Sequence, residues 1–283
     1  MIETAVQMSG LPDLNTEYAL TPEQITAFQQ TGHAHLKSVC TPAEIAVYRP
    51  ILNQAAERFN TETRLLEERD TYGKAFLQIM NLWEQDEKVR RFTLARRFAQ
   101  IAANLLGVDG VRLYHDQALF KEPGGGPTPW HQDQSYWPLD TKKTVTMWMP
   151  LVPILPEIGS MTFASGSHLQ GDLRPVRDDA PISDDSERDF NHLVDERGFA
   201  RVHYGAMQAG DATFHTGWTL HCAPGNPTST MREVMTIIYF ADGTHALEPQ
   251  SKFQHDDIAR WLPDVKPGDL AASVLNPVVY TRL

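Results

Sequence analysis

A histidine and an aspartate two residues apart are the strongest candidates for chemistry in this sequence. His131 and Asp133 lie in the segment 129–134 (PWHQDQ), just beyond a glycine-rich turn at 124–127. On an extended backbone, residues i and i+2 point to the same face, so an imidazole nitrogen and a carboxylate oxygen can bind one metal ion. A lone His-x-Asp pair is more often a surface hydrogen bond, and a two-histidine, one-carboxylate site needs a second histidine.

His221 can supply that second histidine. It lies in the segment 220–226 (LHCAPGN), on a later strand that follows Gly210-Asp211. Three protein ligands on one face of an octahedral Fe(II) ion leave three positions open for a chelating co-substrate and O₂. Taken alone, His221 has a simpler interpretation as a hydrogen-bonded core histidine.

Arg232 follows on the next β-rich segment, across a turn at 225–230. If His221 and Arg232 occupy neighbouring strands of one barrel, the guanidinium can form a bidentate pair with the far carboxylate of a chelating dicarboxylic acid. Taken alone, Arg232 could equally form a surface ion pair. The ordered combination of the four residues favours a metal-dependent oxygenase.

These residues resemble the phytanoyl-CoA dioxygenase-like family of Fe(II)/2-oxoglutarate-dependent oxygenases. The resemblance covers about 111–243 and also includes three shorter motifs: Gly159-Ser160-Met161, Ser165-Gly166-Ser167-His168 and Gly210-Asp211. It implies a double-stranded β-helix, iron held by His131, Asp133 and His221, and Arg232 as the anchor of 2-oxoglutarate. The family often has serine two residues after the distal histidine, where this chain has Ala223.

The activity implied by the resemblance is oxidation of a C–H bond in a small organic substrate, usually hydroxylation. In such a reaction O₂ and 2-oxoglutarate are consumed, and succinate and CO₂ are released. The protein holds the metal ligands, leaves open positions and excludes water.

Further residues are candidates for binding the co-substrate or the substrate. Gln117 and Lys121 have the same parity on one predicted strand, so both can face the barrel mouth. Thr146 and Trp148 share one face of the strand 144–151, and the resemblance directs that face towards 2-oxoglutarate; the alternative is that the methionine face lines the pocket. Trp137 is the preferred aromatic wall of a substrate pocket, although core packing explains such residues equally often.

Two other histidines receive simpler interpretations. His168 ends the Ser-Gly-Ser-His turn, and we expect it to stabilise that loop. His215, six residues before His221, is either a residue that supports the metal ligands or an ordinary strand residue.

The elements that position these residues are predicted to be mainly β-strands with flanking α-helices, in a jelly-roll, cupin-like fold. Threonine, proline and a capping-box residue indicate helix starts at 21–24 and 41–44, and an apolar stripe predicts a third helix from about Asp86 to Leu106. Short β-rich segments then follow at 111–120, 144–151, 161–164, 201–204, 211–215 and 231–240.

We expect one oxygenase domain over 1–283. In it, 1–110 is mainly helical support, 111–243 is the β-helix core and 244–283 is a C-terminal extension. Within the core, 171–200 holds nine Asp and Glu against four Arg and is interpreted as an acidic insertion or lid.

The amino-acid composition limits the kinds of binding partner and the cellular location that we expect for the protein. The 283 residues are 41% hydrophobic and 22% charged, as in folded soluble proteins, and the net charge of -11 has the wrong sign for binding nucleic acid or anionic lipid. Cys40 and Cys222 are too few for a disulfide framework, and the N-terminus lacks the pattern of a signal peptide. We therefore expect a cytoplasmic protein with a small-molecule substrate, no nucleic-acid partner and no membrane partner.

Two other classes of function remain open at this point. A jelly roll with a histidine-rich mouth also suits a cupin-like metal-dependent enzyme with non-oxidative chemistry, and dependence on 2-oxoglutarate would separate the two. A non-catalytic binding module would be expected to lack one of the ligands or the arginine, and this chain has all four.

Overall fold

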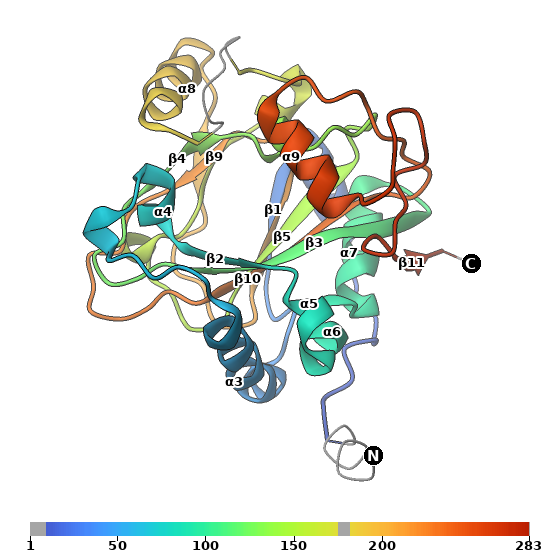
Figure 1. The fold of residues 1–283 in the computed structure, drawn as a ribbon, viewed down its shortest axis with the longest axis horizontal. Coiled ribbons are helices and arrows are strands. Elements are labelled where there is room, and N and C mark those ends of the chain that lie inside the picture. The colour runs from blue at the N-terminus through green and yellow to red at the C-terminus, as the bar shows by residue number, and fades with distance from the viewer. Residues whose placement is uncertain (1–9, 175–181, 283) are drawn as a thin grey trace.

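The computed structural model describes residues 10–174 and 182–282, which form two antiparallel β-sheets with helices around them (Figure 1). The larger sheet has seven strands in the order β1-β8-β5-β10-β3-β11, with β2 also paired to β3, and the smaller sheet has the order β4-β9-β6-β7. The prediction of a mainly β fold with flanking helices is confirmed. The strands are β1 (His33–Leu36), β2 (Leu77–Met80), β3 (Gly110–Phe120), β4 (Thr128–His131), β5 (Thr144–Pro150), β6 (Thr162–Ala164), β7 (Arg201–His203), β8 (Ala212–Thr216), β9 (His221–Ala223), β10 (Val234–Ala241) and β11 (Val278–Thr281).

Helices cover the larger sheet and flank the space between the two sheets. The α-helices are α2 (Pro22–Thr31), α3 (Pro42–Phe59), α4 (Thr71–Ala75), α5 (Leu82–Gln85), α6 (Glu87–Thr93), α7 (Arg96–Leu106), α8 (Asp184–Glu196) and α9 (Lys252–Trp261). Short 3₁₀ helices are η1 (Leu66–Glu68), η2 (Asp133–Tyr136), η3 (Pro156–Ile158) and η4 (Ser167–Gln170). In the described part of the chain, none of the helices has the length and apolar character needed to cross a membrane.

Helices α2 and α3 begin where the sequence predicts. The Thr21 hydroxyl accepts from the Gln24 backbone N–H at 3.2 Å, and the Gln24 side chain accepts from the Thr21 N–H at 2.9 Å. Thr41 and Glu44 repeat this reciprocal pair at the start of α3. Proline at the first helical position of each costs no hydrogen bond, because that N–H has no partner inside the helix.

The predicted helical stretch from about Asp86 to Leu106 is confirmed, but it is interrupted. The segment forms two helices, α6 and α7, separated at Leu94 and Ala95, and Ala95 has an extended backbone. Thr93, at the end of α6, donates its hydroxyl to the buried Asp116 carboxylate at 2.7 Å. The apolar stripe continues across the break because both helices pack on the same core, so hydrophobic periodicity alone does not reveal it.

The six predicted β-rich segments are confirmed as strands β3, β5, β6, β7, β8 and β10. The sequence does not indicate β1, β2 and β11, each four residues long. Their partners lie far away in the sequence, as where His33 of β1 pairs with His215 of β8. Such short strands form because of their tertiary pairing, and the local sequence carries little pattern that would predict them.

The two faces of β5 separate the core from the site. Val145, Met147 and Met149 are fully buried in the main hydrophobic cluster, which also contains residues of α3, α6 and α7. Thr146 and Trp148, on the other face, line a cavity. The alternation of side chains along a strand thus turns one face to the helices and the other to the cavity.

The acidic insertion at 171–200 contains helix α8, which lies beside β4 (Figure 1). Phe190 and Val194 of α8 pack in a cluster with Trp130, and the Glu187 carboxylate accepts from the Trp130 backbone N–H at 2.8 Å. The part of this insertion at 175–181 lies outside the described residues. Helix α8 therefore supports the strand that ends at His131.

Candidate metal centre

The end of β4 and the start of β9 bring two histidine rings close together. His131 pairs with His221 in the register of these strands, and their ring centroids are 4.1 Å apart. Asp133, at the start of η2, places its Oδ1 atom 3.4 Å from His131 Nε2 and 3.6 Å from His221 Nε2. One ligand atom from each of the three residues lies within 4.8 Å of the others, an arrangement that can hold a metal ion.

Backbone carbonyls orient both histidine rings. His131 Nδ1 lies 2.7 Å from the Pro129 carbonyl oxygen, and His221 Nδ1 lies 2.9 Å from that of Thr219. Each Nδ1 therefore carries the proton and donates it, which leaves the Nε2 lone pair directed at Asp133. Burial, together with His131 and His215, holds the pKa of His221 well below its usual range, so its imidazole stays neutral.

The Asp133 carboxylate is held by its other oxygen. Its Oδ2 accepts hydrogen bonds from Thr146 Oγ1 at 2.9 Å and from His215 Nε2 at 3.2 Å, and these two residues pair directly across β5 and β8. Burial alone would raise the pKa of Asp133, but His221, His131 and His215 together hold it well below its usual range. An ionised carboxylate with a free Oδ1 and two imidazole rings whose Nε2 atoms lie near it fit a two-histidine, one-carboxylate metal site.

Arg232 precedes β10 and lines the same cavity, 2% exposed. Its Nη1 donates to the Gly159 carbonyl at 2.8 Å, its Nη2 lies 3.4 Å from the Leu119 carbonyl, and its Nε has no hydrogen-bond partner. No carboxylate among the described residues pairs with this guanidinium, and burial lowers its pKa to about 9. A buried cation with an unused donor can bind an anion.

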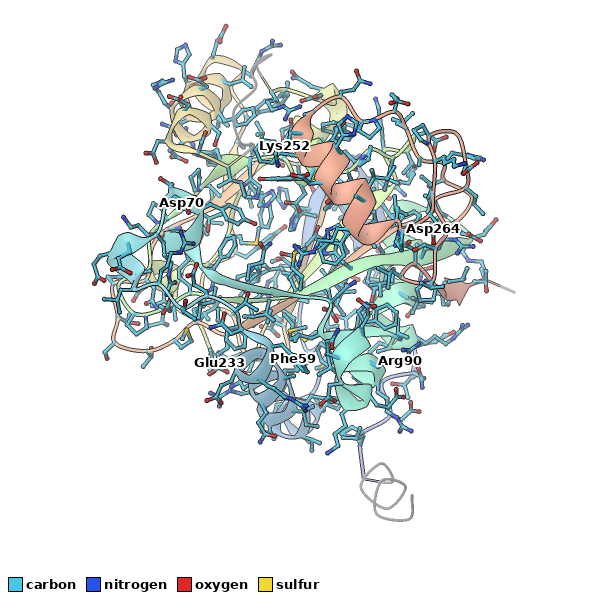
Figure 2. The ribbon with its side chains drawn as sticks, in the orientation of Figure 1. Phe59, Asp70, Arg90, Glu233, Lys252 and Asp264 are labelled. Carbon is cyan, nitrogen blue, oxygen red and sulfur yellow. The ribbon has the colours of Figure 1, made fainter. Side chains whose placement is uncertain are left out.

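Gly159 makes room for that guanidinium. Its φ of +91° lies in the left-handed region, and a Cβ atom at this position would stand 2.9 Å from Arg232 Nη1. Glu233, the residue after Arg232, points away from the cavity and forms an ion pair with Arg49 of α3 at 2.6 Å (Figure 2 labels Glu233 beside α3). Helix α3 therefore fixes the start of β10 with Arg232 turned inwards.

The cavity has a volume of about 270 Å³ and runs along the inward face of β3. His115, Gln117 and Leu119 line it in alternation, from the side of α9 to the side of Arg232. The four-residue step from His115 to Leu119 corresponds to about 13 Å along the strand. The cavity therefore has an α9 end near His115 and an Arg232 end near Leu119. The three candidate metal ligands also line it.

The other sequence-predicted residues fall at different places around this cavity. Gln117, Thr146, Trp148 and Trp137 line it, and Trp148 also lies beneath the Arg232 guanidinium at 5.4 Å. Lys121 is fully buried but does not line it, because its ammonium donates to the Gly126 carbonyl and lies 3.4 Å from the Thr128 hydroxyl. His168 lies 3.2 Å from the Gln29 carbonyl, as expected for a residue that holds a loop.

Several cavity residues were not identified from the sequence. His115 could have been found, since it has the same strand parity as Gln117. Tyr72 comes from α4, and Phe253 and Asp257 come from α9, which lies over the cavity. No local pattern marks these three, because only the tertiary fold brings their helices to the site.

Comparison with known proteins agrees with this geometry. The family model of phytanoyl-CoA dioxygenase (PhyH) matches residues 16–234. A methylphosphonate hydroxylase of Gimesia maris is 22% identical over 224 residues, which cover 78% of this chain and 81% of that protein.

Two solved structures share the fold. The 2-oxoglutarate-dependent carbocyclase SnoK of nogalamycin biosynthesis has a TM-score of 0.74 at 24% identity, over 95% of this chain and 99% of the other. The epimerase SnoN, in complex with Fe³⁺, 2-oxoglutarate and nogalamycin RO, has a TM-score of 0.73 at 24% identity, over 91% and 97%. With the family model matching more than three quarters of the sequence, the chain belongs to the phytanoyl-CoA dioxygenase family of Fe(II)- and 2-oxoglutarate-dependent dioxygenases.

Proposed function

We propose that His131, Asp133 and His221 hold Fe(II), that Arg232 anchors 2-oxoglutarate, and that the enzyme oxidises a C–H bond of a small organic substrate. The observation that carries this proposal is the coexistence of two features in one cavity. One is a triad whose ligand atoms converge, and the other is a buried guanidinium without a carboxylate partner.

Iron bound at the triad with 2-oxoglutarate and O₂ supplies the oxidation of the substrate, while the co-substrate becomes succinate and CO₂. The residues of the chain bind and orient the reactants. Asp133 presents Oδ1 because Thr146 and His215 hold Oδ2, and the two histidines present Nε2 because backbone carbonyls hold Nδ1. Arg232 neutralises the distal carboxylate, and the neighbouring Trp148 keeps water from that pair.

We further propose that the two antiparallel sheets form the double-stranded β-helix expected for this family, within one domain over 1–283. Strands β3 to β10 lie in 110–241, and the helices before them pack on the larger sheet in one continuous cluster. Gln117 lies midway along the cavity, between His115 and Leu119, and Trp137 lies towards the α9 end. Lys121 is better placed to hold the loop 126–128 beside Arg232 than to contact substrate.

The substrate is a small molecule, and a cytoplasmic location without a nucleic-acid or membrane partner stays a prediction from composition. Relatives act on different chemistry: one is named for methylphosphonate, and SnoK and SnoN belong to nogalamycin biosynthesis. The residues of the metal centre therefore do not select the substrate by themselves.

The experiment that tests this function is conversion of 2-oxoglutarate into succinate by the purified chain with Fe(II) and O₂. We expect slow uncoupled turnover that needs both iron and 2-oxoglutarate and is lost in Arg232→Ala. Arg58→Ala, which removes an exposed arginine of α3, serves as the matched control and should leave turnover unchanged. Metal-dependent chemistry that proceeds without 2-oxoglutarate would instead support a cupin-like non-oxidative enzyme.

A further inference from the structure

The α9 end of the cavity is walled by aromatic side chains from several elements. Tyr136 and Phe253 meet edge to face with their ring centroids 6.2 Å apart, and Trp261 lies 5.1 Å from the His115 ring. The aromatic lining residues at this end are Tyr72, Tyr136, Trp137, Phe253 and Trp261. Aromatic walls of this kind favour flat, unsaturated ligands, which can stack or meet them edge to face.

A carboxyl group sits within this wall. The hydroxyl of Tyr114, which is fully buried, donates to Asp257 Oδ2. Asp257 lines the cavity, and its Oδ1 atom accepts no hydrogen bond from the residues that the structure describes. Arg260 also lines this end, but its guanidinium stacks 4.4 Å above Trp261. In its ionised form, Asp257 therefore offers Oδ1 as a free acceptor towards a ligand.

A chain of hydrogen bonds sets the proton on His115. The Tyr72 hydroxyl donates to Gln78 Oε1 at 2.9 Å, and Gln78 Nε2 donates to Gln117 Oε1 at 2.6 Å. The remaining Gln117 group, Nε2, donates towards His115 Nδ1 at 3.5 Å. Because Nδ1 accepts this hydrogen bond, the proton of the neutral imidazole lies on Nε2. His115 is only 2% exposed, and its Nε2 has no hydrogen-bond partner among the described residues.

The cavity continues outwards between α4, α8 and α9. This outer space of about 750 Å³ shares Tyr72, Tyr136, Ile182 and Phe253 with the inner cavity. Its charged lining residues are all acidic: Asp70, Asp184 and Asp185. Figure 2 labels Asp70 at α4 and Lys252 at the start of α9. A bound molecule that extends outwards therefore meets negative charge.

We propose that the substrate is a flat, unsaturated ring system, neutral or cationic, that carries a hydroxyl or amine group donating to Asp257 Oδ1. This inference rests on the proposed function, because it places the substrate on the α9 side of the metal and 2-oxoglutarate on the Arg232 side. His115 Nε2 donates to a second polar atom of the same ring system. The inner cavity also holds the co-substrate, so the remainder of a larger substrate extends into the outer space.

The same lining argues against a small oxyanion as substrate. Arg232 lies at the opposite end of the cavity and is assigned to the co-substrate. At the α9 end an anion would face Asp256 and Asp257 with Arg260 as its cationic neighbour, and it would leave the aromatic wall unused. A phosphonate of the kind named for the Gimesia maris relative is therefore the contrasting ligand.

Matched naphthalene probes test this proposal by calorimetry. The protein is loaded anaerobically with Fe(II) and 2-oxoglutarate at pH 8.5, and then titrated with 2-naphthol, 1-naphthylmethylamine, 1-naphthoate or methylphosphonate. We expect the phenol and the amine to bind at least tenfold more tightly than either anion. Asp257→Asn should weaken binding of the amine at least tenfold, since burial raises the pKa of Asp257 to about 8 and the carboxyl is mostly ionised at pH 8.5.

Two further variants keep the test informative. Asp264→Asn removes the same charge beyond the end of α9, at an exposed residue, and should bind every probe as the unmodified protein does. Phe253→Ala should weaken the phenol and the amine alike while leaving methylphosphonate unchanged. Equal or tighter binding of the anions, absence of binding by all ring compounds, or unchanged amine binding in Asp257→Asn would each overturn the proposal. If 2-oxoglutarate itself does not bind, the proposed function has failed instead.

Discussion

The two ends of the cavity are built in different ways. The metal end, which is the part of the cavity around the three candidate metal ligands, is built on strands and the residue just beyond β4. Hydrogen bonds fix each of these ligands: Pro129 holds His131, Thr219 holds His221, and Thr146 and His215 hold Asp133. The α9 end is formed largely by helices and a loop, with aromatic side chains and an acceptor that has no protein partner.

This difference suggests that the metal end carries out the reaction and that the α9 end determines which substrate binds. A reacting centre needs ligand atoms held within fractions of an ångström, which paired strands and backbone carbonyls provide. Substrate choice can change with the helices and loops that the same sheets carry. Helix α9 lies beyond residue 234, where the family match ends. Substitutions at the metal end should therefore abolish the reaction, and those at the α9 end should change which molecule enters.

The largest effect is expected from His221→Ala. The variant leaves two ligands at the metal end, so iron binding and turnover should both fall to background. His245→Ala, at an exposed histidine beyond β10, is the control for the loss of an imidazole. Wild-type iron content together with wild-type turnover in His221→Ala would show that the triad is wrongly assigned.

Arg232→Ala should have the next largest effect, confined to the co-substrate. Removing one member of a buried, hydrogen-bonded charge pair costs about 2–5 kcal/mol, which corresponds to more than a tenfold loss in 2-oxoglutarate affinity. Arg232→Lys keeps the charge without the planar fork and should lose less. The measurement is a 2-oxoglutarate titration at constant iron, and an unchanged titration curve in the alanine variant would remove Arg232 from this role.

Thr146→Val tests whether the hydrogen bonds behind Asp133 matter for the metal. Loss of such a supporting bond typically reduces metal affinity by about 10–100-fold. Thr213→Val is the matched control, because this neighbouring β8 threonine is buried and its hydroxyl has no hydrogen-bond partner. Equal iron affinity in the two variants would contradict the supporting role of Thr146.

The smallest expected effect is a pH dependence of stability at the α9 end. Burial raises the pKa of Asp257 to about 8, against the lowering effects of the Tyr114 hydrogen bond and Arg260. A carboxyl whose pKa is raised in the folded state contributes stability at low pH, and this is lost as pH rises from about 4 towards 8. Asp257→Asn should therefore gain thermal stability relative to the wild type between pH 5 and pH 8. A constant difference in melting temperature across this range would speak against a buried, protonated Asp257.

The candidate metal end could be outlined from the sequence because one part of its signal is local and the resemblance to a known family adds His221 and Arg232. His131 and Asp133 share a face by spacing, and the alternation of 144–151 correctly divides the methionine face from the cavity face. Thr146 lies on the cavity face and its hydroxyl bonds the Asp133 carboxylate, while its contact with 2-oxoglutarate stays a prediction.

The α9 end could not be predicted in this way. The hydrogen bond from Tyr114 to Asp257 joins residues 143 positions apart, and no periodic pattern marks either of them as a cavity residue. The break between α6 and α7 could not be predicted from the sequence for a similar reason. Thr93 at that break donates a hydrogen bond to Asp116 on β3. Contacts of this length depend on the assembled fold.

Anaerobic titration with Fe(II) and then 2-oxoglutarate tests the central claim most directly, by following the visible charge-transfer absorption of iron chelated by a 2-oxo acid. The account predicts one iron per chain and this absorption in the unmodified protein, its loss in His131→Ala, and its retention in Asp257→Asn. Full iron content and full absorption in His131→Ala would contradict the claim that the paired histidines and Asp133 form the metal centre.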